Sequence, residues 1–476
     1  MRLRLLFLAV LAAAAAACGA QARPQAHARM LARTPLKIGA VVPELLDASL
    51  QDLTIGLMTG GSLADVARVT VTWQKGQTAM DPGLLGDLNT GIQKARAAGI
   101  DVYLDVYPNG SSQTPNSASD QADFAAWTAS TVKAIPGLKH VIVGNESNLN
   151  LFWMPQFGSS GQDLAAAGYE HLLAKTYDAV KAAAPAVEVD GGALAHSGTD
   201  KRGTGRDTHS PAQFILDMGA AYRASHRTKP IMDAFAYHPY MERADLPPTF
   251  RHPRGKTLTI ADYGKLVSVL GRAFQGTKQK GATLPLVYDE FGVEAKVPAA
   301  DASQYTGHEP ATTHPVSEAT QAQYYAEGFH HAASQPTVRT IMVFRLIDSP
   351  FLESFQSGVY YADRKTPKSS LPAVAAAAKR YRARTIAGCA ALLAPKPLVV
   401  WGTKTITCDA DCAYVETFRR VGSSAAVATI GGTAIASIPT RLALAKLKPG
   451  RYRIFLRVTA TAYKANAYTA TSPPFG

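Results

Sequence analysis

The sequence predicts an α/β protein made of a (β/α)₈ barrel, or TIM barrel, followed by a small all-β, immunoglobulin-like sandwich. Between Leu36 and Leu346, short apolar, β-prone runs alternate with longer amphipathic stretches, which is typical of repeated β-α units around a parallel sheet. After Tyr381 the pattern changes to short segments of alternating apolar and polar residues, typical of half-buried antiparallel strands. We assign residues 36–385 to the barrel and residues 395–476 to the sandwich.

The N-terminal residues 1–22 have the pattern of a signal peptide. Two early arginines precede a Leu/Ala run that is too short for a stable membrane span, and Ala20-Gln21-Ala22 suits signal-peptidase cleavage. Residues 23–35 are then a linker, and the protein is expected to be secreted or at the cell surface. A membrane anchor is the alternative, and Cys18 also permits lipoprotein processing.

Eight apolar runs are the predicted barrel strands. They cover residues 36–42, 66–72, 102–107, 140–143, 187–189, 234–238, 284–289 and 340–345. Between them, Asp81-Pro82 offers a cap for a helix over 83–98, and a second helix is predicted over 164–183. Several connections after the strands are long and polar, and in a barrel these form the face where active sites are built.

The C-terminal strands are predicted at residues 399–407, 413–420, 425–430, 433–444 and 451–458. In an oxidising destination, Cys408 and Cys412 are expected to form a local disulfide, although Cys389 could pair with either one or stay free. A zinc site is the competing interpretation. It is disfavoured because the cysteines have no clustered histidines to complete four ligands.

Positive charge gathers at the C-terminal end. The formal net charge is +13, and residues 395–476 hold 11 Lys and Arg against 3 Asp and Glu. A basic domain on an exported protein would be attracted to anionic surfaces such as cell-wall polymers, acidic glycans or lipid headgroups. Simple solubility is the alternative. No nucleic-acid-binding motif is present, so no nucleic-acid partner is expected.

Two glutamates end two of the predicted strands. Glu146 follows the fourth strand and Glu290 the seventh, so both are expected at the mouth of the barrel. Hydrolysis of a glycosidic bond needs two such carboxyl groups, one to protonate the leaving oxygen and one to attack or to activate water. This chemistry requires neither a metal nor an organic cofactor. The expected partner is an oligo- or polysaccharide.

The Asn-Glu pair after strand four, together with the lone Glu at the end of strand seven, resembles the pattern of the clan A glycoside hydrolases. Family 5, the cellulase type, is similar in its accessory residues. The resemblance implies a retaining enzyme for a β-linked sugar, with Glu146 as the acid/base and Glu290 as the nucleophile. It also implies that Asn145 binds the sugar 2-hydroxyl.

Three further positions fit the same resemblance. Arg68, in the second strand, resembles the arginine that keeps the nucleophile ionised. His238 and Tyr240, after the sixth strand, match the clan's His-x-Tyr element, whose tyrosine contacts the nucleophile. The alternatives are a surface charge for Arg68 and packing for the aromatic residues.

The resemblance departs from family 5 at the expected sugar contacts. Tyr107 stands where a histidine usually follows strand three, and Phe344 or Arg345 stands where strand eight usually offers a tryptophan. Phe344 could stack on a sugar, and Trp73 or Trp153 could replace the missing platform. Core packing is the alternative for all of them.

Other acids near the strand ends compete for roles in the cleft. Alternation along the strand predicts that Asp289 turns away from the cleft into the layer between barrel and helices. Asp105, Asp190 and Glu294 could line the cleft. Two other functions remain open: a non-catalytic carbohydrate-binding or cell-surface protein on a barrel scaffold, and a transglycosylase that uses the same glutamates.

Overall fold

The computed structural model describes residues 34–384, 393–463 and 465–476. The predicted signal peptide, the linker up to residue 33, Cys18 and Cys389 lie outside these residues and remain predictions. In the described part of the chain, no helix has the length and apolar character needed to cross a membrane.

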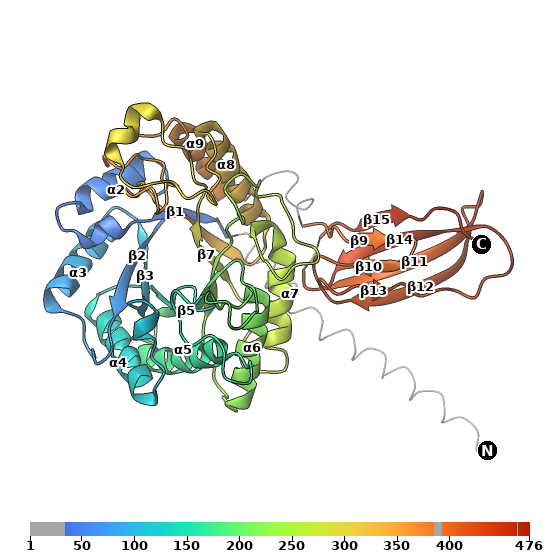
Figure 1. Cartoon of the computed structure of the whole chain (residues 1–476), viewed down its shortest axis with the longest axis horizontal. Coiled ribbons are helices and arrows are strands. Elements are labelled where there is room, and N and C mark those ends of the chain that lie inside the picture. The colour runs from blue at the N-terminus through green and yellow to red at the C-terminus, as the bar shows by residue number, and fades with distance from the viewer. Residues whose placement is uncertain (1–33, 385–392, 464) are drawn as a thin grey trace, which may run out of the picture.

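Eight parallel strands close into a barrel in sequence order, with β8 hydrogen-bonded to β1. This confirms the predicted fold, and each of the eight predicted runs overlaps one strand (Figure 1). The strands are β1 Lys37–Val41, β2 Val66–Trp73, β3 Asp101–Pro108, β4 His140–Val143, β5 Glu188–Ala195, β6 Ala234–His238, β7 Leu286–Phe291 and β8 Val338–Val343.

Helices surround the barrel on its outside (Figure 1). The α-helices are α2 Gln51–Gly60, α3 Pro82–Ala97, α4 Ala118–Ala134, α5 Leu164–Ala183, α6 Pro211–Ala224, α7 Tyr263–Ala273, α8 Glu318–Ser334 and α9 Leu371–Arg382. Short 3₁₀ turns are η1 Pro43–Leu46, η2 Ser111–Gln113, η3 Ile260–Asp262 and η4 Ala299–Gln304.

The helix ends follow from local chemistry. Asp81 caps α3 by accepting a hydrogen bond from the backbone N–H of Leu84 at 2.9 Å, and Pro82 occupies the first turn. Just after α3, Gly99 turns the chain toward β3 with a φ of 83°, a left-handed conformation that favours glycine. Most of the apolar core lies between strands and helices, while a smaller cluster fills the barrel interior.

The C-terminal residues form an all-β module of two antiparallel sheets, as predicted. The first has the order β13-β10-β9 and the second the order β12-β11-β14-β15. The strands are β9 Leu398–Val400, β10 Thr405–Thr407, β11 Cys412–Arg420, β12 Ala426–Ala434, β13 Thr440–Arg441, β14 Tyr452–Ala460 and β15 Tyr468–Thr471.

Two predicted strands of the module are wrong. The segment 399–407 is a hairpin of β9 and β10, because a turn that includes Lys404, with φ of 54°, folds Thr405 back against Val400. The segment 433–444 is interrupted between β12 and β13, where Ser437 is left-handed and Pro439 offers no N–H for a ladder. Apolar alternation marks exposed and buried faces but does not locate such turns.

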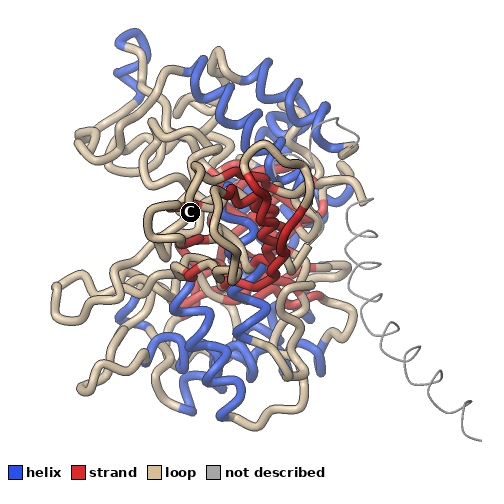
Figure 2. The backbone as a smooth tube through the Cα atoms, turned by 90° about the vertical axis from the view of Figure 1, so that its right-hand side faces the viewer, coloured by secondary structure: helices blue, strands red, loops and turns tan. Residues whose placement is uncertain are grey.

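The predicted disulfide between Cys408 and Cys412 is present and encloses the loop that joins β10 to β11. This loop contacts the barrel. Asp409 pairs with Arg251 at 2.6 Å, and Asp411 pairs with Arg272 of α7 at 2.6 Å. The module therefore stands beside α7 and away from the barrel mouth (Figure 1), and Figure 2 shows it end-on in front of the barrel.

Candidate active site

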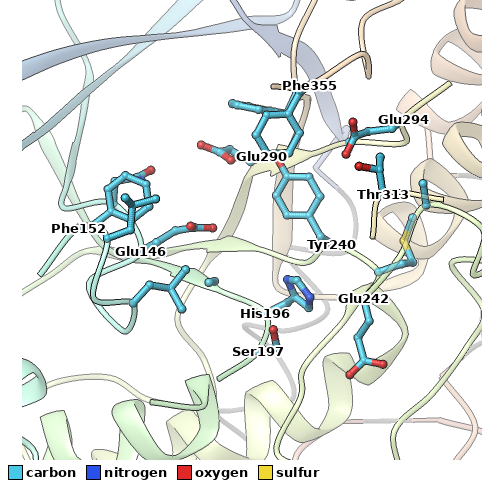
Figure 3. Close-up of a pocket in the computed structure, with 18 of the residues that line it drawn as sticks. Glu146, Phe152, His196, Ser197, Tyr240, Glu242, Glu290, Glu294, Thr313 and Phe355 are labelled. Carbon is cyan, nitrogen blue, oxygen red and sulfur yellow. Dashed lines mark hydrogen bonds between the residues drawn. The ribbon is translucent and has the colours of Figure 1, made fainter. Parts of the chain in front are cut away.

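Glu146 and Glu290 line the same pocket, which has a volume of about 530 Å³ and lies at the carboxyl ends of the barrel strands. Figure 3 shows both carboxylates facing one open space beside Tyr240. One carboxylate oxygen of each glutamate and a ring nitrogen of His238 all lie within 4.8 Å of one another. The structure thus brings together the two acids that the sequence placed at separate strand ends.

A sharp turn after β4 positions Glu146. Gly144 has a φ of 93°, and a Cβ at this position would approach the ring of Tyr169 to 2.6 Å, so only glycine fits. Glu146 itself is left-handed with a φ of 41°, and its N–H donates to the carbonyl of Ala193 at 2.7 Å. Left-handed non-glycine residues are found where the surrounding structure holds them, often at functional sites.

Arg68 on β2 is the buried cation of the site. Its guanidinium donates hydrogen bonds to Glu290, to Asp105 at 2.7 Å and to the side-chain oxygen of Asn145 at 3.0 Å. Burial alone would lower the pKa of Arg68, but the charges of Asp105, Glu290 and Asp289 raise it well above its usual value. Arg68 is therefore a permanent positive charge against Glu290.

Two residues after β6 contact the glutamates. The Tyr240 hydroxyl donates to Glu290 at 2.9 Å, and His238 contacts Glu146 at 3.0 Å through Nδ1 and Asp289 at 3.3 Å through Nε2. Burial alone would lower the pKa of His238, but the neighbouring charges of Glu290 and Asp289 and these hydrogen bonds raise it well above its usual value. A protonated ring donates at both nitrogens, so His238 links Glu146 to Asp289.

Asp289 does not line the pocket, but the prediction that it turns into the layer between barrel and helices is wrong. Asp289 is fully buried beneath the pocket, where it contacts His238 and lies 3.5 Å from Nε of Arg68. The pairing of β7 with β8 shifts register between Tyr288 and Phe291, so strict alternation of side chains fails at this point. Burial raises the pKa of Asp289, but His238 and Arg68 lower it below its ordinary value overall.

The other three candidate acids lie at different positions relative to the pocket. Asp105 lies beneath the pocket against Arg68, and burial is the main cause that raises its pKa to about 6. Asp190 does not line the pocket. It lies near the start of β5, 3.4 Å from Arg339. Glu294 does line the pocket wall.

Aromatic residues flank the two glutamates. Tyr107 and Phe344 line the pocket, together with Phe152, whose ring meets Tyr107 edge-on at 6.0 Å, and Phe355, which meets Phe344 edge-on at 4.9 Å. Sequence analysis missed Phe152 and Phe355 because both lie in loops after strand ends, where no periodic pattern assigns a direction. The position of an aromatic residue in a long loop at the barrel mouth was the available signal.

Trp73 and Trp153 are not sugar platforms. Trp73 is fully buried, packs edge-on against Phe124 at 5.6 Å and donates its ring N–H to the carbonyl of Gln77 at 2.8 Å. Trp153 is buried against Tyr169. Both side chains therefore belong to the core behind the pocket wall.

Metal binding at this site would face two obstacles. Glu146, His238 and Glu290 have a spacing that could hold a cation. However, Arg68 already supplies positive charge to Glu290, and the raised pKa of His238 keeps a proton on the nitrogen that a metal would need. The arrangement fits proton transfer and attack by a carboxylate better than metal coordination.

Glu294 makes a testable contribution to stability. Burial, with a further effect of the Glu309 charge, raises its pKa from 4.5 to about 7. Between these pH values the folded protein holds a proton that the unfolded chain has lost, so the stability that Glu294 contributes declines as pH rises through this window. We expect Glu294→Gln to lack this decline.

The measurement is guanidinium unfolding of both proteins from pH 4 to pH 8. The difference in unfolding free energy, native protein minus Glu294→Gln, should fall up to about pH 7 and then stay constant. A difference that does not change with pH would show that Glu294 titrates normally.

Comparisons with known proteins identify the barrel but no close relative. No protein-family model and no curated protein matches the chain. Among solved structures, the chain is similar to a family 39 glycoside hydrolase from the gut symbiont Bacteroides cellulosilyticus, with 17% identity, a TM-score of 0.50 and coverage of 86% of this chain and 81% of that one. This likeness shows the shared fold.

Two further solved structures are similar at lower scores. A family 5 glycoside hydrolase variant from Streptomyces cattleya, in complex with Manβ1-4GlcNAc, matches at 18% identity and a TM-score of 0.48, over 74% of this chain and 82% of that one. An exo-β-1,4-mannosidase from an Opitutaceae bacterium matches at 15% identity and a TM-score of 0.46, over 74% of this chain and 60% of that one.

Proposed function

We propose that the protein is a retaining glycoside hydrolase that cleaves the O-glycosidic bond of a β-linked saccharide by double displacement. The observation that carries the proposal is the approach of a Glu146 oxygen and a Glu290 oxygen to within 4.8 Å across one pocket. Retaining enzymes hold their two carboxyl groups about 5–5.5 Å apart, whereas inverting enzymes need roughly 6.5–9.5 Å to admit a water molecule between them. The short separation supports the retaining route.

The contacts of the two glutamates support different roles. Glu290 accepts hydrogen bonds from Arg68 and Tyr240, and this arrangement favours a carboxylate that can attack carbon. Glu146 contacts neither and has the more exposed side chain of the two, at 19% against 11%. His238 holds one oxygen of Glu146 at 3.0 Å through Nδ1, and the greater exposure of Glu146 allows it to exchange a proton with the substrate.

The reaction has two steps. An oxygen of Glu290 attacks the anomeric carbon while Glu146 donates its proton to the departing glycosidic oxygen, which leaves with the bonding electron pair. A water molecule then gives a proton to Glu146 and attacks the same carbon, and Glu290 leaves as a carboxylate. Two inversions give net retention.

Asn145 is suited to hold the sugar during these steps. Its side-chain oxygen accepts from Arg68 at 3.0 Å, so its NH₂ group is the donor that remains for a ligand in the pocket that it lines. This orientation supports the 2-hydroxyl contact that the clan A resemblance implies. Export by the predicted signal peptide would place the enzyme among extracellular saccharides.

A mechanism-based label tests the nucleophile. Once a screen of aryl glycosides has found a processed sugar, its 2-deoxy-2-fluoro analogue should form a stable ester, because fluorine slows hydrolysis of the intermediate. Peptide mapping by mass spectrometry should place one label on Glu290, and Glu290→Gln should remain unlabelled. A label on another residue would refute the nucleophile, and a first product of inverted configuration, detected by NMR, would refute double displacement.

Glu146→Gln provides a prediction for the acid/base role. Without a proton donor, the first step should slow by about 10²–10⁴-fold for a sugar or alkoxide leaving group. It should slow far less for a dinitrophenolate, which leaves without protonation. The ratio of kcat/KM for the two substrates, in the native protein and in the variant, measures this difference.

Asn145→Ala serves as the matched control, because it should lower both kcat/KM values by similar factors. Equal losses for both leaving groups in Glu146→Gln would show that Glu146 is not the proton donor.

A further inference from the structure

The four-stranded sheet β12-β11-β14-β15 has one buried and one exposed face. Along β14, Tyr452, Ile454, Leu456 and Val458 are buried while the intervening side chains are outside. The same alternation holds along β11. We call the exposed side the outer face. Its residues are Val415, Thr417, Arg419, Thr429, Gly431, Thr433, Arg453, Phe455, Arg457, Thr469 and Thr471.

Three arginines gather on the outer face. The register sets Arg419 directly opposite Arg453, which brings their Cβ atoms to roughly 5 Å, and sets Arg457 opposite Val415. Arg453 and Arg457 are separated by about 13 Å along β14, since a strand rises about 3.3 Å per residue. The guanidinium of Arg419 lies over the ring of Phe455, 4.5 Å from its centroid.

Within the described residues, no acidic side chain neutralises this cluster. The region 395–476 has three acidic residues. Glu416 is fully buried on the opposite side of β11, and Asp409 and Asp411 pair with barrel arginines at the end of the module. Among the described residues, none forms an ion pair with Arg419, Arg453 or Arg457. Like charges placed opposite each other on a sheet are destabilising, so the fold itself gains nothing from this arrangement.

We propose that the outer face is a binding site for an anionic polysaccharide, one that bears carboxylate or sulfate groups. Guanidinium groups bind carboxylate and sulfate oxygens through paired hydrogen bonds, and two arginines 13 Å apart suit a polymer whose charge repeats. Threonine hydroxyls beside them can hydrogen-bond sugar hydroxyls. The proposal is independent of the chemistry assigned to the barrel pocket.

The surface favours a polysaccharide over a membrane. Its one aromatic ring, Phe455, is only half-exposed and is covered by Arg419, and Val415 is the one exposed apolar side chain of the outer face. A single valine beside three arginines offers little apolar area to insert between lipids. The barrel contacts the module at the loop enclosed by Cys408 and Cys412, at Ser437 and at Tyr463, and none of these residues belongs to the outer face.

The test uses the full chain with Arg419→Gln, Arg453→Gln and Arg457→Gln combined. The matched control combines Arg441→Gln, Lys446→Gln and Lys448→Gln, which removes the same charge from the module outside the outer face. Binding to polygalacturonate, dextran sulfate and neutral dextran is measured by affinity electrophoresis at about 50 mM and 200 mM salt. A melting curve of each protein confirms that the module is folded.

We expect the native protein to bind at least one anionic polymer and to ignore neutral dextran. The outer-face variant should bind at least about tenfold more weakly, which corresponds to 1.4 kcal/mol, whereas the control should change less than about threefold. The polymer that binds identifies carboxylate or sulfate as the recognised group. Cleavage of a small aryl glycoside should be unchanged in both variants, which separates this site from the pocket.

Several results would overturn the proposal. One is equal weakening in the outer-face variant and the control, which would indicate net charge alone. Another is absence of binding by the native protein to both anionic polymers at low salt. A third is stronger binding to vesicles containing phosphatidylserine than to either polymer. If the outer-face variant is unfolded, the Arg→Lys triple variant replaces it, and unweakened binding by that variant would count against paired guanidinium recognition.

Discussion

Replacing Glu290 with glutamine is expected to lower kcat/KM by about 10⁵-fold, because it removes the group that would attack carbon while it keeps the shape of the site. Glutamine can still accept a hydrogen bond from Tyr240, so the fold and the affinity for saccharide should persist. The measurements are steady-state kinetics with an aryl glycoside and calorimetric titration with the product. Retained affinity together with lost turnover would also exclude a purely non-catalytic carbohydrate-binding protein.

Tyr240→Phe is the matched control for that experiment. It removes one hydrogen bond to Glu290 and leaves the carboxylate, so the loss should be limited to about 10–100-fold. For Glu290→Ala, added azide should restore turnover and give a glycosyl azide of inverted configuration. Activity of Glu290→Gln within 100-fold of the native enzyme would contradict the assigned role.

The second large effect is expected from Arg68→Met. The Arg68 side chain is 2% exposed, its guanidinium pairs with Glu290 and Asp105, and Nε lies 3.5 Å from Asp289. Its removal leaves several buried carboxylates without their cation, and breaking a buried ion pair on one side costs about 3–5 kcal/mol. Guanidinium denaturation should show this loss in the barrel transition, together with loss of activity.

Arg68→Lys is the control, because it keeps the charge but loses the forked donor geometry. It should regain part of the stability and little of the activity. A change of less than about 1 kcal/mol in Arg68→Met would mean that water or a proton compensates the acids at this depth.

The barrel could be predicted because parallel strands covered on both faces appear as continuous apolar runs. The ends of these runs also located Glu146 and Glu290, since a short strand leaves little freedom in where its last residue lies. Alternation failed at Asp289, where a register shift between β7 and β8 turns the side chain under the pocket. The position of Trp73 just after the predicted second strand was compatible with both the pocket and the core, so the sequence could not decide between them.

The remaining site residues could not be predicted from the sequence because they lie in loops. Phe355 reaches the pocket from the segment that follows β8, and its neighbours along the sequence give no period that would point it there. Within the module, the β9–β10 turn depends on the left-handed conformation of Lys404. Lysine rarely adopts this conformation, so its presence in the sequence does not predict a turn. Such positions are decided by long-range packing.

The loop closed by the disulfide between Cys408 and Cys412 connects the C-terminal module to the barrel. Within this loop, Asp409 forms an ion pair with Arg251 and Asp411 forms one with Arg272. The Ser268 hydroxyl of α7 also accepts a hydrogen bond from the backbone N–H of Asp411 at 2.9 Å. The disulfide restricts the conformations open to this five-residue loop, so Asp409 and Asp411 are kept close to their partners on the barrel. A polymer bound by the module would therefore be held beside α7, at the side of the barrel and not at its mouth.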